Sequence, residues 1–392
     1  MKVPRPRPGP VRALGLAAAV FAAAAFGSAV ATSAPAASGG DALPGRQVQI
    51  VDTGVSRVSR VPAPPHAART AQSATFQVTY DANFDANPAA KAAFQAAIDI
   101  WSSQLNATVP ITVNAQFRSD LGQNVLGSAG ATESWGNFAG APVRNTFYPV
   151  TLGSALAGRD LNTSNGVNEP MIDANFSSVA NWYFGTDGET PPDKTDFESV
   201  VLHEVGHGLG FAGSAEVKGG DATIGLGGSS APVVYDRFVV DGNGNQPYLL
   251  AGNSALLLSI YTSNNLYWNG PLAIANNNGQ KPKLYAPSTW QKGSSYSHLD
   301  DATYPAGNPN ALMTHAISRG ESRHDPGPIV RGMFADMGWS IAAQSGATPT
   351  ATSLPTATPA ACATPAATGQ TPVPTALANR AWAPAMYRVA CG

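Results

Sequence analysis

Polar and apolar residues alternate along two short stretches, residues 75–80 and 109–117, as they do on half-buried strands. Between them, residues 88–105 carry apolar side chains at helical spacing, and Pro88 suits the first turn of a helix. Two strands that are joined by a crossover helix pair in parallel. The pattern therefore predicts that the folded part begins near Ala74 with a strand, a helix and a parallel strand, as in an α/β or α+β fold.

Further elements are expected later in the chain. Residues 145–152 and 171–176 are short apolar runs of the kind that form strands. A last helix is predicted at residues 328–337, where apolar residues recur at helical spacing and Gly338 follows.

A β-hairpin is expected where the strand-like residues 233–240 run into Asp-Gly-Asn-Gly at residues 241–244. Oxygen-bearing side chains alternate along residues 241–245, as in a calcium loop. However, Gln246 and Gly252 stand where that loop needs glycine and glutamate. We interpret the segment as a plain turn, so a calcium site has no support.

A helix that carries distinctive side chains is predicted after residue 195. Thr195 and Glu198 are spaced as in a capping box, and an apolar run at residues 200–202 follows. Glycines at positions 208 and 210 then end the helix. Within it lies the sequence His-Glu-Val-Gly-His.

His203 and His207 are four residues apart, so a helix places both imidazoles on one face, where they can bind one metal ion. Glu204 follows the first histidine and lies where its carboxylate can take a proton from water at the metal. Only six histidines occur in the whole chain, which makes a chance match to this spacing rare. The motif predicts a catalytic zinc site.

Catalytic zinc usually has three protein ligands. In the compact form of the motif the third histidine lies six residues after the second, but here that position is Gly213. His298, His315 and His324 follow downstream, and Asp236 is a further donor. The residues alone leave these four open as the third ligand.

The part of the chain from residue 176 to 339 resembles the leishmanolysins. His298 is followed by Leu-Met-Thr at residues 312–314 and by a terminal helix that ends in Asp-Met-Gly-Trp at residues 336–339. Leishmanolysins are metzincins with a large insertion before the third histidine ligand. The resemblance implies a zinc site with the ligands His203, His207 and His298, the general base Glu204 and the Met-turn residue Met313.

The resemblance also implies a metzincin-like zincin fold: a twisted mixed sheet, an active-site helix and a C-terminal subdomain that carries the Met-turn. On this basis residues 73–345 form the catalytic domain, and residues 214–297 are the insertion. Two features depart from the family. His315 stands where the family has a proline, and the catalytic domain has no cysteine, whereas the family is rich in disulfides.

Both ends of the chain are expected to lie outside the catalytic domain. Residues 1–31 have a basic start, an apolar run and small residues at positions 29 and 31, as in a secretory signal peptide; an uncleaved membrane anchor is the alternative. Residues 32–72 are expected to be a linker or short propeptide. Residues 346–380, rich in Thr, Pro and Ala, predict an extended stalk, and residues 381–392 a tail. Cys362 and Cys391 lie in this region, where an exported protein permits a disulfide.

We therefore expect a secreted zinc endopeptidase that acts on protein or peptide substrates. An extended substrate would pair with the edge strand of the sheet, which we place at residues 171–176. Only 12% of the residues are charged, the net charge is -2, and no basic stripe is present, which argues against a nucleic-acid partner. A non-catalytic surface adhesin that keeps a zinc site is the alternative, and a zinc hydrolase of other bonds is a third hypothesis.

Overall fold

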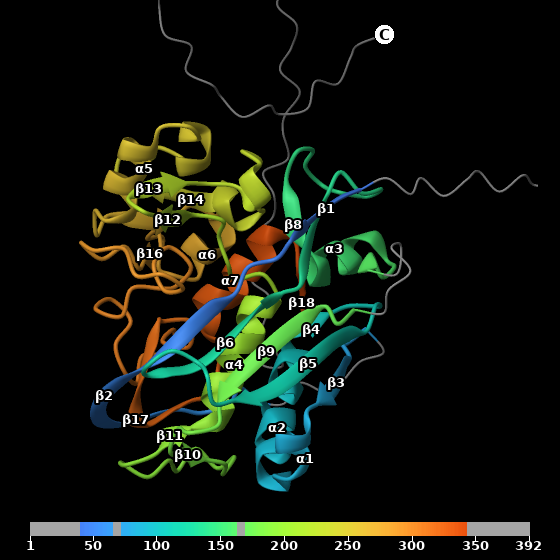
Figure 1. Cartoon of the computed structure of the whole chain (residues 1–392), viewed down its shortest axis with the longest axis vertical. Helices are drawn as coiled ribbons and strands as arrows, with labels where there is room; N and C mark the ends of the chain where they lie inside the picture. Colours follow the sequence, from blue (N-terminus) through green and yellow to red (C-terminus); the bar gives the residue numbers. More distant parts are fainter. Residues whose placement is uncertain (1–39, 66–71, 163–168, 343–392) are drawn as a thin grey trace, which may run out of the picture. The chain divides into compact units, whose positions relative to one another are not determined.

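A six-stranded mixed sheet forms the centre of the protein, with the strand order β17-β2-β6-β9-β5-β3 (Figure 1). The computed structural model describes residues 40–65, 72–162 and 169–342. The strands of this sheet are β2 (Val48–Val61), β3 (Phe76–Tyr80), β5 (Ile111–Arg118), β6 (Val125–Ala131), β9 (Ile172–Ser177) and β17 (Ala316–Arg323). Strands β3, β5 and β9 are parallel, β6 is antiparallel to both β9 and β2, and β17 is parallel to β2. The fold is therefore mixed α+β, and the predicted parallel pair is confirmed.

Two long helices pack together beside the sheet, α2 (Pro88–Gln104) and α4 (Phe197–Gly208). The indole of Trp101 on α2 donates a hydrogen bond of 2.9 Å to the carbonyl of Leu202 on α4. An aromatic cluster fills the space between these helices and the strands; its rings belong to Phe84, Phe94, Phe117, Phe176 and Phe197. This core holds α4 firmly, and the predicted helix at residues 88–105 is confirmed.

Smaller elements surround this core. A three-stranded sheet contains β1 (Asp41–Pro44), β7 (Glu133–Gly136) and β8 (Phe147–Pro149). Two strand pairs join β10 (Trp182–Tyr183) to β11 (Thr195–Asp196) and β4 (Leu105–Asn106) to β18 (Ser340–Ile341). Two short helices are α1 (Ala82–Asp85) and α3 (Val150–Ala157).

The segment between α4 and β17 folds mostly into short elements. Its strands are β12 (Glu216–Lys218), β13 (Asp221–Thr223), β14 (Val239–Asp241), β15 (Leu266–Trp268) and β16 (Lys283–Leu284), and its helices are α5 (Ser254–Tyr261) and α6 (Pro271–Ala275). Turns of 3-10 helix lie at Leu226–Gly228, Tyr235–Phe238 and Pro247–Leu250. Helix α7 (Gly327–Met337) packs on α6 so closely that a Cβ atom at Gly332 would lie 2.6 Å from the Cα atom of Ala273. The predicted last helix is confirmed.

The prediction that the folded part begins near Ala74 is wrong. Residues 41–44 form β1, and residues 48–61 form β2 inside the main sheet, so they are not a linker. Burial in β2 is concentrated near its start, and its middle is exposed, which leaves a weak pattern of apolar residues in the sequence. Its partners, β6 and β17, lie far away along the chain, so local periodicity could not reveal the pairing.

Three further predictions need correction. Strand β9, which covers residues 172–177, lies between β6 and β5 and is therefore not an edge strand. No hairpin forms at residues 233–244, because a 3-10 turn replaces the first strand and β14 pairs with β15 instead. The turn itself is present, with the Asp241 carboxylate accepting hydrogen bonds from two following backbone N–H groups. The strand expected at residues 145–152 ends at Pro149, where α3 begins.

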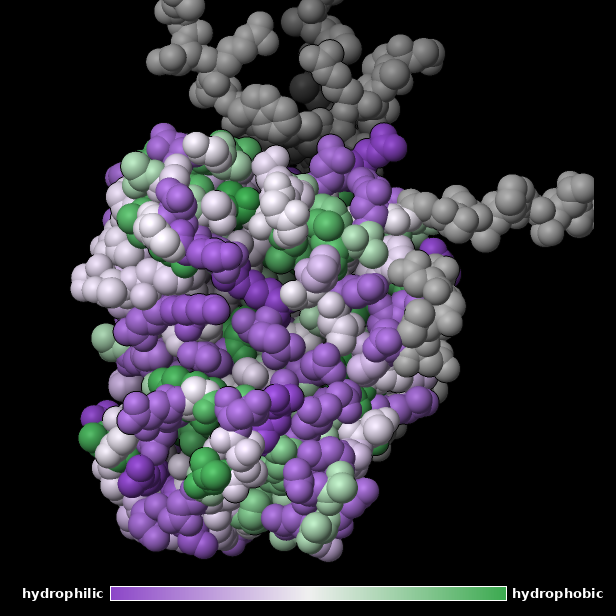
Figure 2. Space-filling model, viewed as in Figure 1, coloured by the Kyte–Doolittle hydropathy of each residue, from purple (hydrophilic) through white to green (hydrophobic). Residues whose placement is uncertain are grey.

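The visible surface mixes hydrophilic and hydrophobic residues in small groups (Figure 2). Among the described residues, none of the helices combines the length and the apolar character needed to cross a membrane. The predicted signal peptide, stalk and tail, together with Cys362 and Cys391, lie outside the described residues.

Candidate metal centre

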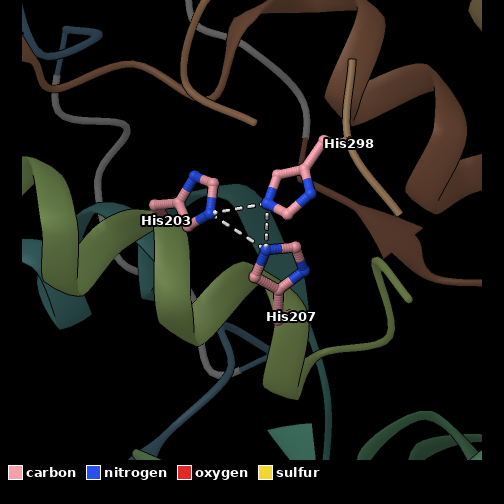
Figure 3. A group of neighbouring side chains, drawn as sticks. All are labelled: His203, His207 and His298. Atoms are coloured by element: carbon pink, nitrogen blue, oxygen red, sulfur yellow. Dashed lines mark hydrogen bonds between the residues drawn. The ribbon is translucent and has the colours of Figure 1, made fainter. Parts of the chain in front are cut away.

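Three imidazole rings meet at one point beside α4 (Figure 3). His203 and His207 project from successive turns of the helix, and His298 comes from the chain before β17. The Nε2 atoms are 2.9 Å apart for His203 and His207, 3.1 Å for His207 and His298, and 3.3 Å for His203 and His298. All three side chains are buried.

The other ring nitrogen of each histidine has a backbone carbonyl as its partner. The Nδ1 atoms of His203, His207 and His298 lie 2.7, 2.6 and 2.6 Å from carbonyl oxygens; these belong to Leu312, Phe211 and Ser294. A carbonyl can only accept, so each Nδ1 carries the hydrogen. The three Nε2 atoms therefore turn unprotonated lone pairs toward one another, which is the tautomer that metal-bound histidines adopt.

A divalent cation between these nitrogens fits both their charge and their spacing. Three lone pairs this close repel each other unless a positive charge lies between them. Zinc bound at about 2.0–2.1 Å to each nitrogen with tetrahedral geometry places the nitrogens about 3.3 Å apart. Burial, and then the neighbouring histidines, hold the pKa of all three rings well below the usual value, so they stay neutral as zinc requires.

Glu204, which is also on α4, is fully buried next to these three histidines. Its Oε1 atom accepts a hydrogen bond of 3.1 Å from the backbone N–H of Ile50 on β2. Its Oε2 atom has no hydrogen-bond partner among the described residues. Burial raises the pKa of the Glu204 carboxyl well above its usual value, while backbone bonds from Ile50 and Ala129 act in the opposite direction. A buried carboxyl with a free oxygen and a raised pKa is a suitable general base or acid.

The N-cap of helix α4 lies one residue later than predicted. Asp196, not Thr195, is the N-cap, and its carboxylate accepts the N–H of Ser199 at 2.9 Å. The glycines of the motif are required by packing as well as by the helix end. A Cβ atom at Gly208 would lie 2.5 Å from Cγ2 of Ile172 on β9, so only glycine lets α4 approach this strand.

The other candidate ligands do not belong to the trio of histidines, although the ring of His315 lies 6.4 Å from that of His298 between centroids. Nδ1 of His315 lies 2.5 Å from the Asp301 carboxylate, and its ring stacks on Tyr285 with centroids 3.9 Å apart. His324 is 2.7 Å from the Asp196 carboxylate at the start of α4. Asp236 accepts hydrogen bonds from backbone N–H groups of Ser214 and Val233, each at 2.9 Å. Each of these side chains has a structural partner of its own.

Sequence reasoning missed a buried ion pair that holds the turn around Met313. Arg323 on β17 donates from Nε to the Glu321 carboxylate at 2.8 Å. Its Nη1 donates to the carbonyl of Ala311 at 3.0 Å and to Oγ1 of Thr314 at 2.8 Å. The carbonyl of Leu312, which receives the His203 Nδ1–H, lies within this turn. The available signal was that Glu321 and Arg323 lie two positions apart on one strand, because charged residues are scarce in this chain.

A protein-family model matches the part of the chain that contains α4. A model of the SPBPB7E8-like family matches residues 154–224, a stretch that includes all of α4 and thus His203, Glu204 and His207. No curated protein and no solved structure matches the chain.

Proposed function

We propose that this chain is a secreted, zinc-dependent endopeptidase with a metzincin-like site. The observation that carries the proposal is the convergence of three neutral, buried imidazoles beside a buried carboxylate with one free oxygen. His203, His207 and His298 would hold the ion. Three protein ligands are the number that catalytic zinc sites use.

A zinc ion held there supplies a Lewis acid that acidifies water and polarises a carbonyl group. Glu204 accepts the proton of the attacking water on its free Oε2 atom and then delivers it to the amine nitrogen that leaves. The carbonyls of Leu312, Phe211 and Ser294 keep each ring in the right tautomer and orientation. Met313 packs against α4 at Gly206, which supports the resemblance to a Met-turn.

Glu204→Gln tests the function, because the amide keeps the shape of the side chain but cannot take a proton. Zinc content should stay at the wild-type level, while cleavage of a mixed peptide library should fall by about 100-fold to 10,000-fold. The comparison uses the intact chain and a chain cut directly after β2, because the N–H of Ile50 on β2 is bonded to Glu204, and the fall is measured in the form that cleaves faster. Glu169→Gln, at an exposed position, is the matched control and should change neither quantity. Zinc content is measured by mass spectrometry of the metal, and cleavage by mass spectrometry of the peptides.

Two outcomes would contradict the proposal. Equal cleavage by the Glu204→Gln variant would remove the general base from the mechanism. The chain could also bind zinc but cleave no peptide, both when intact and when cut directly after β2. That result would favour the alternative of a binding protein that keeps a zinc site.

A further inference from the structure

Strand β2 fills a slot between two walls of the proposed active site. On one side it pairs antiparallel with β6, with Val48 opposite Ala129 and Ile50 opposite Gly127. On the other side, the N–H of Gln49 donates to the carbonyl of Gly293 at 3.1 Å. The N–H of Val51 donates likewise to the carbonyl of His315 at 3.1 Å. The second wall is thus the stretch of chain that carries His298, and Figure 1 shows β2 running between β6 and β17.

The same short segment contacts the catalytic machinery directly. The backbone N–H of Ile50 is hydrogen-bonded to Glu204, and the Ile50 side chain is completely buried. Four residues earlier, Arg46 lines a pocket together with His207 and Gly213. A segment that bonds to the general base through Ile50 and lines the pocket beside a metal ligand through Arg46 lies where an extended substrate would have to pass.

The backbone of this segment also approaches the far end of β6 very closely. A Cβ atom at Gly130 would lie 1.9 Å from the carbonyl oxygen of Arg46, and one at Gly45 would lie 1.7 Å from that of Ala131. Only glycine allows contact this close. The close contact between the two segments therefore depends on a glycine in each of them.

The rest of β2 is different in character. Residues 53–58 are exposed, with Val55 at 53% and Val58 at 56% of their accessible surface. Residues 51–61 pair in parallel with β17, whereas residues 45–51 lie beside Glu204 and the histidines. Burial is thus concentrated where the segment covers the site.

We propose that residues 45–51 are an internal substrate mimic that keeps the full chain latent, an inference that rests on the proposed endopeptidase function. An extended peptide binds to a protein strand by adding to its free edge, and one edge accepts one strand. Strand β6 has no free edge while β2 is in place. Release of β2 exposes the backbone of β6 and removes the N–H of Ile50 from the Glu204 carboxylate, whose Oε2 atom takes the proton.

The test is a full chain in which residues 62–65, directly after β2, are replaced by the recognition sequence of a site-specific protease. Cutting there leaves all residues present and breaks only the covalent link that follows β2, so that β2 is held by its pairing with β6 and β17 alone. A matched control places the same sequence at Gly219 and Gly220, in the turn between β12 and β13, where an added Cβ atom would have no neighbour within 4 Å. Circular dichroism and zinc content confirm that each cut protein stays folded.

Two readouts besides activity follow the release of β2. One is the affinity for a short peptide hydroxamate, a zinc-chelating probe of the cleft, measured by calorimetry. The other is amide hydrogen exchange in β6, which needs no metal. After the cut, the proposal expects at least tenfold tighter hydroxamate binding and faster exchange along β6, while the control cut changes neither.

A second variant covers the case in which the cut segment stays bound. Val48→Asp combined with Ile50→Asp buries two carboxyl groups between β6 and the chain that carries His298, which weakens the binding of the segment. Equal hydroxamate affinity in the uncut chain, the cut chain and the cut double variant overturns the proposal. If the probe binds the opened cleft but no peptide is cleaved, latency is upheld and the endopeptidase function fails. If the uncut chain cleaves peptides as fast as the opened one, the function is upheld and latency fails.

Discussion

The sulfur atom of Met313 packs against the backbone of Gly206, and a Cβ atom added at residue 206 would lie 2.9 Å from it. Gly206 lies on α4 between Glu204 and His207, so the turn at Met313 supports the helix at the level of the site. The indole of Trp101 would also lie 3.3 Å from the added atom. This contact explains why the motif carries glycine at its fourth position.

Gly206→Ala should therefore destabilise the protein, although alanine is the better helix former. Overpacking of a filled core costs about 1–3 kcal/mol, more than the gain of about 1 kcal/mol in helix propensity. Urea denaturation measures the free energy of unfolding. The cost should shrink in a Met313→Ala background, where the sulfur is gone; an unchanged cost would show that Met313 is not the obstacle.

His298→Ala should remove the tightly bound zinc, because two imidazoles remain from a set of three. His315→Ala is the matched control, since its ring is paired with Asp301 and stacked on Tyr285. It should keep a full equivalent of metal. Metal analysis after dialysis against a weak chelator distinguishes the variants, and zinc retained by His298→Ala would exclude that residue as the third ligand.

Zinc affinity should be nearly constant from pH 8 to about 6.5 and should weaken only below that. The pKa of each of the three histidines is lowered in the folded protein, so the rings are already neutral in this range and protons do not compete with zinc. Zinc affinity is measured on the Glu204→Gln variant, because this variant lacks the neighbouring carboxyl group whose pKa is raised. Titration against a fluorescent chelator gives the affinity. A steady loss between pH 8 and 7 would mean that a ring binds protons more readily than its burial allows.

Arg323→Met should cost about 3–5 kcal/mol of stability, because it leaves the Glu321 carboxylate buried without its cation. Arg319→Met is the control on the same strand; its side chain is 44% exposed, and its pair with Asp52 is worth about 0–1 kcal/mol. Zinc affinity should also fall in Arg323→Met, since Arg323 fixes the turn whose Leu312 carbonyl orients His203. Loss of stability with unchanged zinc affinity would limit Arg323 to a structural role.

Local patterns in the sequence predicted the elements that depend on local interactions. Helix α2, helix α7 and the parallel pair of β3 and β5 were predicted because periodicity and crossover rules act within a few tens of residues. The pairing of His203 with His207 on one face follows from the helical repeat alone. The choice of N-cap was one residue off, because Asp196 is also held by His324 from a distant segment.

The sequence by itself thus determined helix α4, its two histidines and its carboxylate, since one turn of helix is enough to juxtapose them. Only the tertiary structure decided that His298 joins them, that Arg323 holds the supporting turn and that β2 covers Glu204. Each of these relationships joins residues far apart along the chain. Backbone hydrogen bonds across a sheet and the packing of a core are set by the whole fold, and no local pattern of side chains encodes their register.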